Sequence, residues 1–248
     1  MKKILCLIVL MFMASACARQ PSTVPPADSA DRWQAFVARS GAVKEAPYLL
    51  NASLRFGTEG DTRRVTALLW GNDSRSLRMD VMAGIGAVVA KIWESGDEFL
   101  VYSPTENRAF FHQGSNKPLL RVGVPVPFSL DELAALLNGR LVTVFGDRYS
   151  DSQALANGHV GFTLSSAVGG LLEIDAQGQA VAWQENGSRG WSMAIAYDEA
   201  GLHPDGQTAV LLVKERQAPA PFNNEQLSLL LPDSTPVLPL ERYTAPQQ

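Results

Sequence analysis

The sequence predicts a mainly β protein with helices, of the α+β class, built from eleven or twelve short strands and two helices. Runs of alternating or β-branched residues recur through most of the chain, separated by short clusters of Gly, Asn, Asp and Pro. Two stretches, 28–40 and 130–138, instead carry apolar residues at helical spacing. The dipeptide Asn186-Gly187 adds a strong hairpin signal in the second half.

Residues 1–16 predict a cleavable export signal, with two lysines before an apolar run that is too short for a permanent membrane span. The run ends in Ala14-Ser15-Ala16-Cys17, which resembles the lipobox of bacterial lipoproteins. We therefore expect Cys17 to be lipidated and to begin the mature chain. The alternative is an ordinary secretory signal with an incidental cysteine. By analogy with lipoprotein sorting, Ala18 favours an anchor in the outer membrane, with the body on the periplasmic face.

The mature chain is expected to have a short tether, one domain and a loose end. Residues 17–27 contain the lipidated cysteine and three prolines, a composition typical of a flexible tether. Residues 28–235 predict a single domain, and residues 236–248 a loosely held C-terminal tail. Cys6 would leave with the signal, so no pair remains for a disulfide. Loss of two lysines moves the formal charge from -4 to about -6, and no basic patch predicts nucleic-acid binding.

Residues 28–40 predict an amphipathic first helix. Trp33, Phe36 and Val37 form its apolar stripe, Asp28 or Ser29 can cap its start, and a glycine ends it. We expect the stripe to pack on the body. A membrane-surface helix is the weaker alternative because the polar face is not rich in lysine.

The region from 48 to 113 predicts a six-stranded antiparallel meander. Its expected strands are residues 50–56, 65–70, 77–82, 87–93, 99–102 and 108–112. The connections have hairpin length, whereas a parallel crossover would need far more chain.

A bend at residues 122–128 precedes the second helix, expected over residues 130–138. Ser129 and Glu132 form a capping box, in which each side chain can accept a hydrogen bond from an otherwise unpaired amide. Leu130, Leu133, Leu136 and Leu137 share one face of this helix. The helix must therefore cover apolar surface.

The second half returns to strands after this helix. Those expected are residues 160–164, 170–174, 180–184, 191–197, 208–214 and 226–231, with a proline-containing loop over residues 217–224.

Reactive residues form no recognisable catalytic or metal-binding motif. His112, His159 and His203 have no paired ligand spacing, and no nucleophile elbow or phosphate loop is present. Asp131 and Glu132 are adjacent on a helix and do not face each other. We expect a protein that is not an enzyme and that needs no metal or cofactor. A hydrolase with scattered Ser, His and Asp has no support in the pattern.

Several segments resemble the LolB family, outer-membrane lipoproteins that accept other lipoproteins from a periplasmic carrier, and related LolB-like lipoproteins. The clearest are LVYSPTENR at 100–108, VGVPVP at 122–127 and LLNGRL at 136–141, and Trp33 also fits. The resemblance spans about residues 30–235. It implies a LolA/LolB-like fold, a half-open antiparallel β-barrel of about eleven strands around a hydrophobic cavity covered by helices. It also implies acyl chains as ligand and a LolA-like carrier as partner.

The family has a protruding apolar loop after its third strand that helps to release cargo into the membrane. Gly84, Ile85 and Gly86 occupy that place here, with Ile85 as the tip. The resemblance implies membrane insertion of this loop. The alternative is a tight hairpin whose isoleucine folds back onto the core.

Alternation along the strands gives the candidates for the cavity wall. They are Leu54, Phe56, Leu69, Met79, Val81, Ile92, Phe99, Val101 and Phe110 on strands, and Leu133, Leu136 and Leu137 on the second helix. The same residues could fill an ordinary core. We therefore expect a monomeric, acyl-binding lipoprotein active in lipoprotein transport, and the alternative is an envelope interaction module with a filled core.

Overall fold

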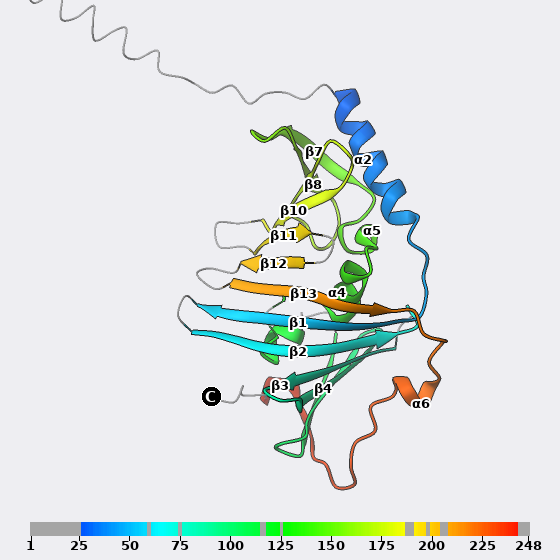
Figure 1. The fold of residues 1–248 in the computed structure, drawn as a ribbon, viewed down its shortest axis with the longest axis vertical. Coiled ribbons are helices and arrows are strands. Elements are labelled where there is room, and N and C mark those ends of the chain that lie inside the picture. Colours follow the sequence, from blue (N-terminus) through cyan, green and yellow to red (C-terminus); the bar gives the residue numbers. More distant parts are fainter. Residues whose placement is uncertain are drawn as a thin grey trace, which may run out of the picture.

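The computed structural model describes residues 26–58, 61–73, 76–114, 118–124, 126–186, 191–196, 199–203 and 208–242 (Figure 1). The expected signal, Cys17 and most of the tether lie outside the described residues, as does the end of the chain after residue 242. No helix among the described residues is long and apolar enough to cross a membrane.

The meander predicted for the first half is confirmed. Its strands are β1 (Tyr48–Thr58), β2 (Asp61–Gly71), β3 (Leu77–Ala83), β4 (Ala87–Ser95), β5 (Glu98–Ser103) and β6 (Arg108–Gln113). Each pairs antiparallel with the next. Glycines with positive φ at Gly84, Gly86 and Gly96 allow the tight turns after β3 and β4.

The second half continues the same sheet. It comprises β7 (Tyr149–Ala154), β8 (Val160–Leu164), β9 (Leu171–Ile174), β10 (Ala180–Gln184), β11 (Ser192–Ala196), β12 (Glu199–His203) and β13 (Thr208–Gln217). β13 pairs antiparallel with β1, which joins the two halves, and the sheet order runs from β14 (Val237–Pro239) through β6 and β1 to β7. The sheet is open, with β7 and β14 at its two ends. An open barrel of mainly β structure with helices, the predicted fold class, is confirmed.

The described residues contain three strands that the pattern did not predict. β7 has the polar sequence YSDSQA, and β12 is the short run EAGLH, so neither carries a strand signal of its own. Each forms by pairing with its neighbours in the sequence, β7 with β8, and β12 with both β11 and β13. The third is β14, near the C-terminus.

The first helix, α2 (Pro26–Gly41), packs along the second half of the sheet, as Figure 1 shows. The centroids of its Trp33 ring and the Phe162 ring of β8 lie 5.1 Å apart, and the Trp33 indole N–H donates to the backbone oxygen of Asp147 at 2.9 Å. Phe36 is also buried. The apolar stripe therefore covers the body, as predicted.

The central helices lie against the sheet. They are α3 (Pro118–Arg121), α4 (Leu130–Leu137) and α5 (Leu141–Phe145), and Arg216 of β13 donates to the backbone oxygen of Leu137 at the end of α4. The predicted capping box is confirmed, because the Glu132 amide donates to the Ser129 hydroxyl at 3.1 Å and the Ser129 amide to the Glu132 carboxylate at 2.8 Å.

The strand predicted at 226–231 is wrong. Residues Asn224–Leu227 form a helical turn, α6, in which Asn223 and Gln226 make a second capping box. The hydrogen bonds of this capping box favour a helical turn over the strand that the short leucine run after it had predicted.

The C-terminal segment predicted as a loose tail is held in place up to residue 242. β14 (Val237–Pro239) pairs parallel with β6, and a 3-10 turn (Leu240–Arg242) follows it with Leu240 fully buried. Hydrogen bonds also hold the segment before it, since Asn72 and Phe222 exchange two bonds of 2.7 Å. The chain from β13 to β14 is thus a strap from the middle of the sheet to its edge.

Candidate functional site

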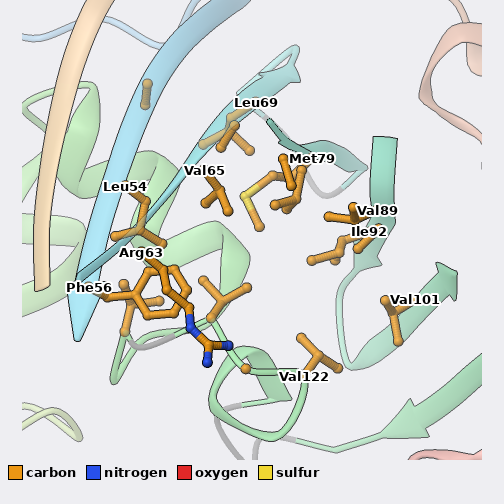
Figure 2. A pocket seen from close by; sticks show the side chains of 18 of the residues that line it. Leu54, Phe56, Arg63, Val65, Leu69, Met79, Val89, Ile92, Val101 and Val122 are labelled. Atoms are coloured by element: carbon orange, nitrogen blue, oxygen red, sulfur yellow. The ribbon is translucent and has the colours of Figure 1, made fainter. Parts of the chain in front are cut away.

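A cavity of about 540 Å³ lies between the first half of the sheet, α4 and the loop residues Val122, Gly123, Val124 and Val126 (Figure 2). This volume falls within the range of about 300–1,000 Å³ that small-molecule sites occupy. The expected alternative of a filled core does not describe this part of the protein.

The register of the strands explains why the lining is apolar. Alternate residues of a strand share a face, and directly paired residues of antiparallel strands face the same side. Leu54 on β1 pairs with Val65 on β2, and Met79 on β3 pairs with Ile92 on β4. All four line the cavity. A single inward face therefore runs continuously across the strands.

Ten of the twelve residues predicted for the cavity line it. They are Leu54, Phe56, Leu69, Met79, Val81, Ile92, Val101, Phe110, Leu133 and Leu137.

Phe99 and Leu136 are buried but are not part of this lining. Phe99 is the second residue of β5, beside the β4–β5 turn and beyond the end of the cavity. Leu136 is rotated by about 100° from Leu137 around α4, and so faces another part of the core.

Sequence reasoning missed the small and irregular parts of the wall. Ala67 and Val65 alternate with Leu69 on β2, so the strand pattern did contain a signal for them. The loop residues that line the cavity, such as Val122 and Val124, have no periodic pattern. Leu211 reaches the lining because β13 pairs with β1, a contact between distant parts of the chain.

Polar lining residues gather at one end of the cavity. Ser103, Thr105 and Glu106 lie at the end of β5 and in the β5–β6 hairpin, and Arg63 lies near the start of β2. In an antiparallel meander the β1–β2, β3–β4 and β5–β6 connections point in one direction. All of these polar residues therefore belong to one polar mouth, on the same side as the hairpin that carries Ile85.

Buried polar contacts secure the opposite end. The Glu94 carboxylate of β4 accepts from the backbone amides of Leu130 and Asp131 at the start of α4. Burial raises the pKa of Glu94, although the hydrogen bonds from these two amides lower it in part. The charge of this carboxylate also suits the positive end of a helix.

A second polar cluster lies near this closed end. Arg140, which follows α4, forms an ion pair with Asp73, a residue of the β2–β3 connection. Burial is the largest cause that raises the pKa of Asp73, and the Arg140 guanidinium opposes it. Burial also raises the pKa of the Tyr48 hydroxyl far above its ordinary value. The ion pair between Arg140 and Asp73 ties the end of α4 to the connection between β2 and β3.

Ile85 projects from the tip of the β3–β4 hairpin. Its relative exposure is 109%, so the residue is fully exposed, and the alternative that it folds back onto the core is wrong. Positive φ angles of 57° at Gly84 and 93° at Gly86 shape the turn around it. The resemblance assigned this loop to membrane insertion, which remains a prediction.

The histidines whose side chains are described lie outside the cavity lining. His159 contacts Glu173 at 2.5 Å between Nδ1 and Oε1, and His112 lies 3.5 Å from Glu241. Among the described residues, no group of three or more His, Cys, Asp and Glu side chains could hold a metal ion. The arrangement at the cavity itself favours apolar binding with a polar contact at the mouth.

No family model and no curated protein sequence matches the chain. Solved structures do match its fold. A LolA superfamily protein from Nitrosomonas europaea aligns with a TM-score of 0.55 and 9% identity, over 79% of this chain and 97% of that protein. A DUF1329 family protein from Desulfovibrio piger aligns with a TM-score of 0.52 and 11% identity, over 80% of this chain and 96% of that one. The described chain therefore has a LolA-like fold.

Proposed function

We propose that this protein binds acyl chains non-covalently in the cavity and receives or inserts lipoproteins or lipids at the outer membrane. The observation that carries the proposal is an apolar cavity of about 540 Å³ that is polar at one end only. Burial of each methylene group contributes about 0.8 kcal/mol, so an alkyl chain is the ligand that gains most from such a wall. The LolA-like fold supports the same ligand class.

The proposed activity is binding rather than catalysis. The polar lining residues, within the part of the chain that is described, are Arg63, Arg64, Ser103, Thr105 and Glu106. Histidine, the usual base for a serine nucleophile, is not among these residues. The cavity accordingly holds its ligand through apolar contact.

The proposed location is the periplasmic face of the outer membrane, with lipid on Cys17 as the anchor. The support is the lipobox-like sequence before Cys17 and the tether-like composition that follows. A periplasmic LolA-like carrier is the proposed source of the cargo. LolB-like receptor activity is the form of this function that the resemblance implies.

The hairpin that carries Ile85 is the proposed contact with the membrane. It lies on the same side as the polar mouth, and its isoleucine is fully exposed. Transfer of one isoleucine side chain into lipid contributes about 2 kcal/mol, which orients an encounter without anchoring the protein. This arrangement presents the cavity mouth to the bilayer.

A binding experiment tests the proposed function. The full chain with Cys17→Ala is titrated with a fluorescent fatty-acyl probe, and a triacylated lipopeptide is added as competitor. We expect saturable binding that the lipopeptide displaces. Ala67→Phe adds volume to the wall without adding charge, and Leu133→Glu puts a carboxylate into it, so both should abolish binding.

Leu230→Glu is the matched control, because Leu230 is exposed and lies outside the cavity lining. It should bind the probe as the parent chain does. Circular dichroism and thermal unfolding establish that each variant is folded. A folded parent chain that fails to bind the probe would overturn the proposal.

A further inference from the structure

The register of β2 places one arginine on the apolar face of the cavity wall. Arg63 pairs with Phe56 of β1, and the next inward pair along the strands is Val65 with Leu54. Residues two apart on a strand share a face, so Arg63 continues the row of Val65, Ala67 and Leu69. A cation therefore lies in the same row as these apolar side chains, two positions after Asp61, where β2 begins.

Arg63 lies at the mouth and is exposed to solvent. Figure 2 shows its guanidinium extending from beside Phe56 toward the side of the pocket where Val122 lies. Its charge is thus in contact with water and does not bear the cost of deep burial. A ligand that enters the cavity from this end passes close to the guanidinium.

The register places the neighbouring arginines on the other face of the sheet, although Arg64 also borders the cavity. Arg64 pairs with Arg55, and its Nε donates to the Ser53 hydroxyl at 2.9 Å. Because successive residues point to opposite faces, both side chains leave β1 and β2 on the side away from Arg63. Of the two arginines of β2 that border the cavity, Arg63 is the one whose register matches the apolar wall, whereas Arg64 is held by Ser53.

We propose that the natural ligand is an amphiphile with an anionic headgroup, a carboxylate or a phosphate, which Arg63 binds at the mouth while the acyl chain fills the cavity. This inference rests on the proposed function and narrows its ligand class. A guanidinium offers paired donors that match either anion bidentately. Glu106, on the β5–β6 hairpin side of the mouth, repels the same headgroup and directs it toward the β2 wall.

The test compares two probes that differ only in headgroup charge. cis-Parinaric acid and its methyl ester are titrated against the full chain with Cys17→Ala. The acid should bind more tightly than the ester, and Arg63→Met should weaken the acid about tenfold while leaving the ester unchanged. Glu106→Gln should strengthen binding of the acid. High ionic strength should weaken the acid selectively.

Arg55→Met is the matched control, since it removes the same charge from the opposite face one strand away. It should bind both probes as the parent chain does. Ester binding also establishes that Arg63→Met retains a folded cavity.

Competition distinguishes the two sources of the anion. Palmitate and lysophosphatidylglycerol are compared with monopalmitoylglycerol, which is neutral. Stronger displacement by either anion supports the inference and identifies the headgroup as carboxylate or phosphate. Equal binding of acid and ester, or an Arg63→Met variant that binds the acid normally, would overturn the headgroup assignment while leaving acyl binding intact. Failure of both probes would overturn the proposed function as well.

Discussion

The carboxylate of Glu94 on β4 accepts a hydrogen bond of 3.0 Å from the backbone N–H of Leu130, the first residue of α4. Its second oxygen accepts from the amide of Asp131 at 2.9 Å. The first amides of a helix have no partner within the helix. A strand side chain therefore satisfies two of them and fixes α4, whose Leu133 and Leu137 line the cavity.

Replacing Glu94 should destabilise the fold at this junction. Glu94→Ala leaves two amides without their acceptor in a buried setting, and we expect the free energy of unfolding to fall by about 2 kcal/mol at neutral pH. Glu94→Gln keeps one acceptor oxygen and should cost less. Urea unfolding measures both. Equal free energies of unfolding for the parent chain, Glu94→Ala and Glu94→Gln would show that water replaces the carboxylate at no cost.

The same residue predicts a pH dependence of stability. Burial raises the pKa of Glu94 in the folded state, so the folded protein binds this proton more tightly than the unfolded chain does. The stability linked to protonation of Glu94 is then fully present below the unfolded pKa, about 4.3, and is lost as pH rises through the raised folded value, whereas the hydrogen bonds to the two amides remain. The stability of the parent chain relative to Glu94→Gln should fall over this window. If the stability of the parent chain relative to Glu94→Gln rose with pH instead, the pKa of Glu94 would not be raised in the folded state.

The strap depends on Arg78. This buried side chain donates to the backbone oxygen of Ser228, lies 3.2 Å from Asp80, and stacks 5.1 Å from the Trp70 ring centroid. Arg78→Met should lower the free energy of unfolding by about 2 kcal/mol and speed hydrogen exchange at 222–228.

Arg148→Met is the control for this variant, because Arg148 is highly exposed. It should change stability by less than about 0.5 kcal/mol. Unchanged exchange at 222–228 in Arg78→Met would mean that the bonds from Trp70 and Asn72 hold the strap without Arg78.

Ile85→Glu should weaken association of the Cys17→Ala chain with vesicles of phosphatidylethanolamine and phosphatidylglycerol. Loss of about 2 kcal/mol corresponds to roughly thirtyfold weaker binding, which co-flotation can measure. Thermal stability should not change, because the side chain is fully exposed in the folded protein. Leu230→Glu changes another exposed leucine-sized side chain and should leave vesicle association unaltered. Equal flotation of both variants would exclude Ile85 as the membrane contact.

Local patterns were enough to predict the first half of the fold and one helix start. The meander of β1 to β6 follows from period-two alternation and short turns. The capping box of Ser129 and Glu132 can be predicted locally, because it depends only on residues within four positions. Ten cavity residues could be named because alternation assigns a strand residue to a face. Whether that face would enclose space or be filled was left open by the same pattern.

The sequence by itself therefore determined the β meander, the apolar faces and the capping of α4. Tertiary structure alone decided that β7, β12 and β14 become strands, because each forms by pairing: β7 with β8, β12 with β11 and β13, and β14 with the distant β6. It also decided that the cavity stays open and that Glu94 meets Leu130, 36 positions away. Periodicity reports which face a side chain occupies. The volume between faces and the partner of a buried charge depend on how distant segments close around one another.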